Sequence, residues 1–288
     1  MIRHEQYDIL KPDLVNQKLK EFFLEDNIQN DITTPLAQPD NKSVQAVFLA
    51  KEDLHFSGKE IILQSFPDCH IIRIENDGSF IAKGQSIAVL QGKIQTLLSK
   101  ERVVLNLLQR MSGITSQTKA LTRITTHRNI QLLDTRKTTP GLRMFEKFAV
   151  CMGGGTNHRY SLKDAIMIKD NHLIGLDSDN DILNIAKIFR LSYPDIDLEL
   201  EVDTKEQLKI ALESEATSIL LDNFSPEKLK EIIPYIRSHS NGKNKYIELS
   251  GGITPETLSH YCIRGVDGIS MGCITHNIKS KDISLDLK

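Results

Sequence analysis

The chain has 288 residues, of which 40% are hydrophobic and 26% are charged, and its formal net charge is −2. This balance is ordinary for a globular protein and excludes the strongly basic face of a general nucleic-acid binder. No segment reaches the roughly 18 apolar residues of a membrane span, and the first residues contain no apolar run of signal-peptide length. The four cysteines are scattered and form no CxxC pair. We therefore expect a cytoplasmic protein with reduced thiols that binds neither membrane nor nucleic acid.

The first third of the chain predicts a domain of helices and short strands. Apolar spacing indicates one helix near residues 14–24 and a longer helix over residues 94–111. Between them, turn residues bound or interrupt three β-like runs, which predict an antiparallel or mixed sheet. The runs are SVQAVFLA, CHIIRIEN and SFIAKGQSIAVLQGK, and the pattern changes near residue 112.

Beyond residue 112, short apolar runs alternate with helical stretches. Helix starts are predicted at Thr204, at Ser225 with Pro226, and at Thr254 with Pro255, since Ser and Thr are favoured N-caps and Pro suits the first turn. Strands that alternate with helices are parallel and joined by crossover helices, as in a barrel or a doubly wound sheet. The apolar runs occupy residues 130–134, 165–169, 198–202, 217–222, 246–250 and 268–272.

Polar residues at the ends of these runs favour the barrel. In a barrel, the carboxyl ends of all strands meet at one mouth, whereas a doubly wound sheet gathers ligand groups mainly at its switch point. Every run ends in, or is followed by, groups suited to binding. These groups are Asp134 to Lys137, Lys169 to Asn171, Glu201 with Asp203, Asp222 with Asn223, Ser250 to Gly252, and Gly272.

The stretch from Leu133 to His172 predicts a pocket for a small, strongly anionic ligand. It holds seven Lys and Arg residues against four Asp and Glu residues, interleaved with glycine-rich turns. Arg136 can grip a carboxylate or phosphate with a bidentate fork, and Lys137 adds a point charge. His158 and Arg159 follow three consecutive glycines. Lys169 ends a strand, where it could serve as a Schiff-base nucleophile or as an anion anchor.

Two further groups lie downstream. Glycines in the loops Ser250–Gly252 and Met271–Cys273 would let main-chain N–H groups approach a phosphate, with help from a following helix N-terminus. Glu201 and Asp222 end two successive strands. Two carboxylates facing a phosphate-rich ligand invite Mg²⁺, directly or through water, and could also stabilise a developing positive charge.

Nine motifs between about residues 94 and 285 follow a fixed order: ERVVLNLLQRMSGI, LDTRKTTPGLR, EKFAV, GGGTNHR, IKDNH, LELEVD, LDN, SGGIT and DGISMGCITHN. The ordered set resembles the quinolinate phosphoribosyltransferase family. The resemblance implies conversion of quinolinate and phosphoribosyl pyrophosphate into nicotinate mononucleotide, pyrophosphate and CO₂, with Mg²⁺ as cofactor. It implies an α/β protein with an N-terminal α/β sandwich domain at 1–111, against which the tail 276–288 packs back, and an incomplete, TIM-like α/β barrel with parallel strands at 112–275.

The resemblance also implies a homodimer, or a higher oligomer, whose subunits share active sites. The partner subunit would contribute Arg102, and Lys137, Glu201 and Asp222 would be catalytic. Cys273 stands where the family often has Ala, and we expect it to act through its backbone. The implied substrate-binding residues are Arg102, Thr135, Arg136, Lys137, His158, Arg159, Lys169, Glu201, Asp222, Ser250, Gly251, Gly252, Met271, Gly272 and Cys273.

Three alternatives remain open at this point. One is a relative of the same fold group that is associated with molybdenum transport. Another is a Schiff-base aldolase that acts through Lys169, which leaves the Arg136–Lys137 and His158–Arg159 pairs under-explained. The third is a sensor that binds pyridine dicarboxylates or nucleotides, against which the carboxylates Glu201 and Asp222 argue.

Overall fold

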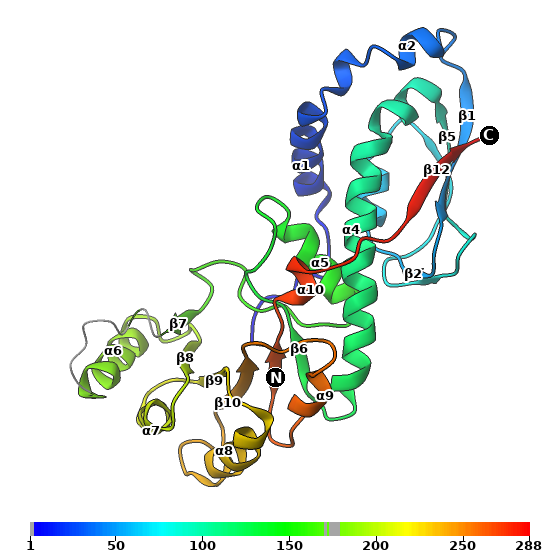
Figure 1. The fold of residues 1–288 in the computed structure, drawn as a ribbon. Helices are drawn as coiled ribbons and strands as arrows, with labels where there is room; N and C mark the ends of the chain where they lie inside the picture. The colour runs from blue at the N-terminus through cyan, green and yellow to red at the C-terminus, as the bar shows by residue number, and fades with distance from the viewer. Residues whose placement is uncertain (1–2, 170–171, 173–178) are drawn as a thin grey trace. The chain divides into compact units, whose positions relative to one another are not determined.

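The computed structural model describes residues 3–169, 172 and 179–288 (Figure 1). The chain divides into two compact units. The parallel-sheet unit consists of Met1–Gln6, Ala120–Thr138 and Gly155–His276, and the antiparallel-sheet unit consists of Tyr7–Lys119, Thr139–Gly154 and Asn277–Lys288. The chain thus passes between the units several times, and the domain limits 1–111 and 112–275 stay a prediction. None of the described helices is long and apolar enough to cross a membrane.

The antiparallel-sheet unit is built on a four-stranded sheet in the order β12–β1–β5–β3. Neighbouring strands are antiparallel, and the last strand of the chain pairs with the first. The predicted β-like runs therefore form strands, as expected. The strands are β1 (Ser43–Ala50), β3 (His70–Ile74), β5 (Ser86–Lys93) and β12 (Ile283–Leu287), and a separate pair joins β2 (Leu54–His55) to β4 (Phe80–Ile81).

Helices bury the apolar side of this unit. Helix α1 (Pro12–Glu25) has Pro12 in its first turn and buries Val15 and Leu19, which lie one turn apart. It contacts α3 (Lys59–Ser65), and Phe66 beyond α3 packs against Phe48 of β1 with ring centroids 6.2 Å apart. The shorter helical segments are η1 (Ile28–Asn30) and α2 (Thr34–Ala37).

Helix α4 (Ile94–Thr126) is longer than the sequence predicted, because it continues beyond residue 111 through a run of small and hydroxylated residues. Ser112 accepts a hydrogen bond from the Ser57 main chain, and Thr115 donates one to the carbonyl of Ala149 on α5 (Arg143–Met152). A Cβ at Gly113 would lie 2.5 Å from the carbonyl oxygen of Lys279. These residues make close packing and buried hydrogen bonds, so the change of pattern near residue 112 falls inside a helix.

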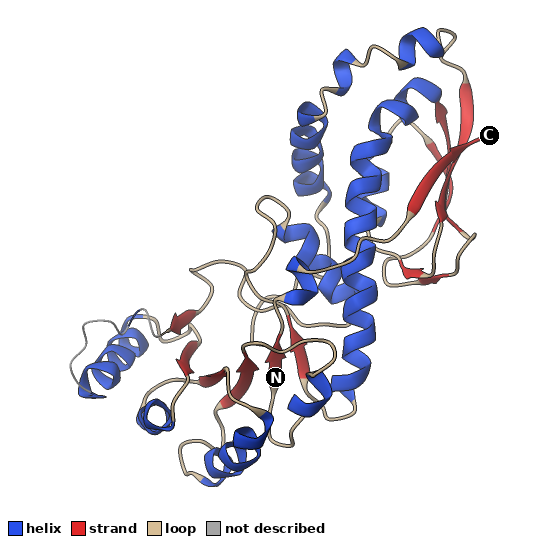
Figure 2. Cartoon of the chain, viewed as in Figure 1, coloured by secondary structure: helices blue, strands red, loops and turns tan. Residues whose placement is uncertain are grey.

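The parallel-sheet unit contains a six-stranded sheet in the order β6–β11–β10–β9–β8–β7 (Figure 2). All its pairs are parallel, and the first strand lies beside the last, with the sheet open between β6 and β7. This is the topology of an incomplete α/β barrel, which confirms the predicted fold class. The strands are β6 (Gln131–Leu133), β7 (Ile166–Ile168), β8 (Leu198–Val202), β9 (Ser218–Asp222), β10 (Tyr246–Ser250) and β11 (Gly268–Ser270).

Two of the three predicted helix starts are confirmed. Thr204 caps α7 (Lys205–Glu213) by accepting from the Gln207 N–H, while the Gln207 side chain accepts from the Asp203 N–H. Ser225 caps α8 (Pro226–Ser238) by accepting from the Lys228 N–H. The helices α6 (Asp179–Ser192), α7 and α8 lie along the outer side of the strands (Figure 1).

The third predicted start, at Thr254 and Pro255, is wrong. The main chain of Thr254 donates to the hydroxyl of Thr257 and accepts from the Thr257 N–H, which closes a turn. The following helix α9 begins only at Leu258 and ends at Tyr261. Helix α10 (Cys273–His276), after β11, is equally short. Neither loop therefore leads into a helix long enough to contribute a strong dipole.

Candidate active site

A cavity of about 510 Å³ opens at the carboxyl ends of the parallel strands. Residues from the ends of all six strands contribute to its walls, as expected for a barrel mouth. The predicted site residues that line it are Thr135, Arg136, Lys137, His158, Arg159, Lys169, Glu201, Asp222, Ser250, Gly251 and Gly252. Asp170 and Asn171, which also follow a predicted strand, lie outside the described residues.

The Met271–Cys273 segment supports the pocket but does not line it. Met271 is buried, and the Gly272 position lies so close to Lys137 that a Cβ there would be 2.8 Å from its Cδ. Thr275 donates a hydrogen bond of 2.7 Å to the Lys137 carbonyl. This segment thus fixes the loop that carries Arg136 and Lys137. Arg102 lies on α4 in the antiparallel-sheet unit, where it is exposed.

Four cationic residues of the lining, called the cationic wall below, suit an anionic ligand: Arg136, Lys137, Arg159 and Lys169. The Nε atom of Arg136 is buried and has no hydrogen-bond partner among the described residues. Burial, together with the nearby charge of Arg136, lowers the pKa of Arg159. Arg159 is held by a hydrogen bond of 2.8 Å from its Nη1 to the carbonyl of Ala165. Two guanidinium groups that repel one another gain most from a bound carboxylate or phosphate.

The buried carboxylate of Asp134 holds the main chain of His158. One carboxylate oxygen accepts the His158 N–H at 2.8 Å, and the other accepts the Asn157 side-chain amide at 2.7 Å. Asp134 directly follows β6, so the first strand of the sheet holds the GGGTNHR segment in place. Hydrogen bonds to a buried carboxylate are strong, and this orientation of the His158 backbone is therefore well determined.

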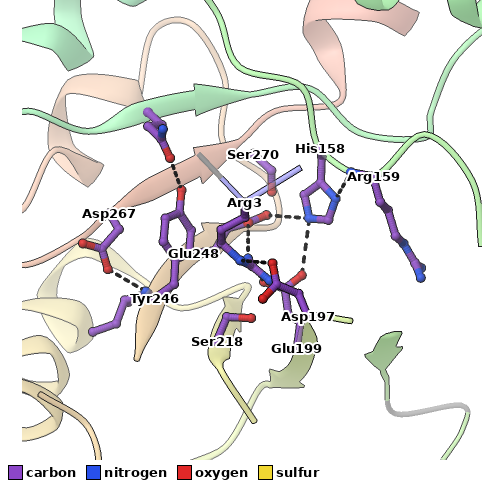
Figure 3. A network of polar contacts seen from close by, with 12 residues as sticks. Arg3, His158, Arg159, Asp197, Glu199, Ser218, Tyr246, Glu248, Asp267 and Ser270 are labelled. Atoms are coloured by element: carbon purple, nitrogen blue, oxygen red, sulfur yellow. Dashed lines mark hydrogen bonds and ion pairs between the residues drawn. The ribbon is translucent and has the colours of Figure 1, made fainter. Parts of the chain in front are cut away.

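Two features act in opposite senses on the His158 ring. Burial alone would lower its pKa, but Glu248 and Glu199 outweigh burial and raise the pKa to about 10. The Arg159 N–H, however, points at Nδ1 over 2.7 Å, and a nitrogen that accepts a hydrogen bond carries no proton. The other ring nitrogen, Nε2, faces Glu199 at 3.3 Å and Glu248 at 3.5 Å (Figure 3), and these two carboxylates cause the raised pKa. Protonation of Nδ1 requires the Arg159 N–H to turn away.

Lys169 and Glu201 form an ion pair across the strand ends of β7 and β8. Asp222, at the end of β9, accepts a hydrogen bond of 2.6 Å from the Asn223 amide. Glu201 and Asp222 both line the cavity, and their carboxylate oxygens are the donors that Mg²⁺ prefers. The donor set therefore fits a magnesium ion that shares its coordination with ligand oxygens and water.

The Ser250–Gly252 loop turns sharply where glycine alone is tolerated. Gly251 has φ +87°, and a Cβ there would lie 2.3 Å from Asn223 Oδ1. The Asn223 main chain donates to the Ser250 carbonyl at 3.0 Å, so the loops after β9 and β10 are tied together. Because α9 is short, an anion in this loop would depend on main-chain N–H groups more than on a helix dipole.

Several lining residues were not predicted from the sequence. Glu248 also belongs to a buried cluster with Glu199 behind the cavity wall. Strand alternation could have found both, because Glu199 shares a strand face with Glu201, and Glu248 with Ser250. The lining residues without a predicted role are Met167, Leu220, Glu248 and Ser270.

Comparisons with known families agree with this geometry. The family model described as "Quinolinate phosphoribosyl transferase, C-terminal domain" matches residues 114–286, and the corresponding N-terminal domain matches residues 31–112. The chain belongs to the quinolinate phosphoribosyltransferase family. It is 41% identical over 274 residues to the "Probable nicotinate-nucleotide pyrophosphorylase [carboxylating]" of Bacillus subtilis. That alignment covers 93% of this chain and 92% of the Bacillus subtilis protein. It is 35% identical over 264 residues to the Mycobacterium leprae nicotinate-nucleotide pyrophosphorylase [carboxylating], covering 89% and 91%.

Solved structures of this family share the whole fold. The nicotinate-nucleotide pyrophosphorylase from Francisella tularensis matches with a TM-score of 0.89 and 30% identity, covering 99% of this chain and 100% of that chain. NadC from Streptococcus pyogenes matches with a TM-score of 0.87 and 32% identity, covering 97% and 98%. The match extends over both sheets, so the two-unit architecture is that of the quinolinate phosphoribosyltransferase family.

Proposed function

We propose that this chain transfers a phosphoribosyl group from phosphoribosyl pyrophosphate to quinolinate and releases pyrophosphate and CO₂, giving nicotinate mononucleotide for NAD biosynthesis. The family match over both domains carries this conclusion. It favours the transferase over the molybdenum-associated relative, the aldolase and the sensor. The ion pair of Lys169 with Glu201 also speaks against the aldolase, because a Schiff-base nucleophile must be an uncharged amine.

The cationic wall suits the acceptor substrate. Quinolinate is a dicarboxylate, and the guanidinium groups of Arg136 and Arg159 can each grip one carboxylate with two N–H groups. Lys137 and Lys169 supply further positive charge. His158 also lines the cavity, and its ring faces the buried carboxylates of Glu199 and Glu248. In this proposal the wall orients the pyridine nitrogen toward the ribose carbon, and orientation supplies a large part of the catalysis.

The opposite side suits the phosphoribosyl donor. Main-chain N–H groups of Ser250–Gly252 are proposed to hold the 5′-phosphate. As the bond from the ribose carbon to pyrophosphate breaks, its electron pair leaves with pyrophosphate and the carbon becomes cationic. Glu201 and Asp222 face this region and would stabilise the developing charge. Mg²⁺ bound by these two carboxylates, directly or through water, would supply charge neutralisation for the pyrophosphate.

Decarboxylation needs no nucleophilic side chain. The lone pair of the pyridine nitrogen forms the bond to the ribose carbon, and the nitrogen becomes cationic. The bond from ring carbon 2 to its carboxylate then breaks, its electron pair stays on the carbon beside the cationic nitrogen, and CO₂ departs. The carbon finally takes a proton from solvent. Fixed charges of the pocket would hold the substrate through these steps.

Arg102 enters this proposal through a partner subunit. An exposed arginine on α4 gains a role if a homodimer brings it to the cavity of the other subunit. The exposed side chain of Ile32 lines a surface pocket together with Arg102, and a subunit contact would cover it. The cytoplasmic location stays part of the proposal; the four described cysteines are all free thiols.

The direct test is product formation. The protein is incubated with quinolinate, phosphoribosyl pyrophosphate and Mg²⁺, and nicotinate mononucleotide is separated by chromatography. Nicotinic acid replaces quinolinate in the control, because it lacks the carboxylate that leaves. We expect product with quinolinate and not with nicotinic acid. Binding of quinolinate without turnover would support the sensor instead.

A further inference from the structure

Behind the cavity wall lies a buried charge cluster formed by Arg3, Glu199 and Glu248 (Figure 3). The side chains of Glu199 and Glu248 are 1% and 0% exposed, and that of Arg3 is 7% exposed. Arg3 Nη1 lies 2.9 Å from Glu199 and 3.8 Å from Glu248, and its Nε lies 3.5 Å from Asp197. Arg3 therefore connects the first residues of the chain to the interiors of β8 and β10.

The cluster has the outline of a cation site. Ligand atoms of His158, Glu199 and Glu248 all lie within 4.8 Å of one another, as around a metal ion. The Arg3 guanidinium contacts both carboxylates, so Arg3 supplies the positive charge that a metal ion would otherwise supply at this position. Burial alone would lower the pKa of Arg3, but the surrounding carboxylates outweigh burial and raise it, which keeps the guanidinium charged.

Glu248 needs this charge because it lies at the cavity. It lines the wall, yet neither of its buried carboxylate oxygens has a hydrogen-bond partner among the described residues. An uncompensated carboxylate in a low-dielectric wall would repel an anionic ligand on the other side. Among the ion pairs of the described residues, Arg3 and the His158 ring both face Glu199 and Glu248, and Arg3 is the partner whose charge persists at any ordinary pH.

The segment Arg3–Gln6 also holds the His158 segment mechanically. The ring of His4 stacks on the ring of His158, with centroids 4.6 Å apart. The Gln6 side chain accepts the Asn157 N–H at 2.8 Å and donates to the Asn157 carbonyl at 3.2 Å. The Arg3 guanidinium lies 4.8 Å from the centroid of the Tyr246 ring. These contacts fix Arg3 on one side and His158 on the other.

We infer that Arg3 is a positioning residue for acceptor binding: it offsets the negative charge of Glu199 and Glu248 at the cavity wall and thereby holds His158 and Arg159 available for the dicarboxylate. The inference rests on the proposed function only for the identity of that ligand. Arg3 touches no substrate, so its loss acts through the wall. We expect the affinity for quinolinate to change more than the turnover number or the KM for phosphoribosyl pyrophosphate.

Four variants test this inference. Arg3→Met removes the charge and keeps an unbranched side chain, whereas Arg3→Lys keeps the charge. The double variant Arg3→Met with Glu199→Gln removes one carboxylate together with its partner and so restores the balance. Arg237→Met is the matched control, since Arg237 pairs with Asp267, is also partly buried, and does not line the cavity.

Quinolinate binding is measured by calorimetry, and the steady-state constants are measured for both substrates. We expect Arg3→Met to weaken quinolinate binding by at least about tenfold, with partial recovery in Arg3→Lys and in the double variant. Arg237→Met should leave the quinolinate Kd unchanged. A merely structural role would lower the active fraction, and hence kcat, in Arg3→Met and Arg237→Met alike without changing KM; that result overturns the inference.

Thermal unfolding keeps the test independent of activity. If Arg3 acts through charge balance, the double variant unfolds at a higher temperature than Arg3→Met alone. If the second substitution lowers the midpoint further, Arg3 is only a packing residue and the inference fails. Wild-type protein that does not bind quinolinate contradicts the proposed function, and the unfolding comparison then still decides the role of Arg3.

Discussion

Gly251 offers a sharp test of how the strand-end loops build the site. Its φ of +87° alone would cost an alanine roughly 1–2 kcal/mol of stability. The new Cβ would also lie 2.6 Å from the Asn223 main-chain nitrogen, where an ordinary contact is at least 3.4 Å. The loop must therefore move by nearly 1 Å. Displacement of that size at a positioning loop costs about 10²-fold in rate.

The assay for Gly251→Ala combines denaturant unfolding with steady-state kinetics. We expect kcat/KM to fall about 10²-fold, with the KM for phosphoribosyl pyrophosphate raised, because the loop binds the 5′-phosphate in our account. Gly84→Ala is the control, since Gly84 has φ +84° in the antiparallel-sheet unit and open space around its Cβ position. It should lose stability but not activity. Equal losses of activity in both variants would show that the Ser250–Gly252 loop has no special role in binding.

Further predictions concern the charges of the site. Lys137→Ala should cut kcat/KM at least about 10²-fold while leaving the unfolding midpoint unchanged, because Lys137 is exposed at the cavity; unchanged kinetics would remove its catalytic role. Burial alone would raise the pKa of Glu199, but Arg3 and His158 outweigh burial and lower that pKa below its ordinary value of 4.5. The ionised carboxylate therefore stabilises the fold above pH 4.5, and this contribution is lost as the pH falls below 4.5 toward the lowered pKa. Urea unfolding between pH 3 and 6 should accordingly show a shallower pH dependence for Glu199→Gln than for wild type, and equal slopes would contradict the ion pairing. EDTA should abolish turnover and Mg²⁺ restore it; turnover that survives chelation excludes the metal. Arg102→Ala mixed with Lys137→Ala should recover part of the activity in heterodimers, and the absence of recovery at any ratio would count against shared sites.

The regular parts of the fold were predictable from local patterns. The alternation of apolar runs and capped helices gave all six parallel strands, and the polar residues at their ends gave most of the cavity wall. These predictions succeed because strand ends of a barrel converge whatever the loops do. The end of α4 was missed because Ser112, Thr115 and their neighbours resemble a polar linker in sequence, while in the structure they pack closely against other elements.

The buried charges could not be predicted in the same way. Glu199 and Glu248 stand inside apolar strands, where the two-residue alternation marks them as inward-facing, but nothing local identifies the cation that balances them. That cation, Arg3, lies 196 residues away along the chain from Glu199. A contact at such separation follows from tertiary packing alone, so the structure is needed to connect the first residues to the wall of the site.

Quinolinate that carries ¹³C in its 2-carboxylate gives a direct test of the proposed reaction. The protein is supplied with this substrate, phosphoribosyl pyrophosphate and Mg²⁺, and ¹³CO₂, pyrophosphate and nicotinate mononucleotide are quantified together. We predict that the three products form in equal amounts and that all the label appears in CO₂. Label retained in the nucleotide, or CO₂ released without pyrophosphate, would contradict it.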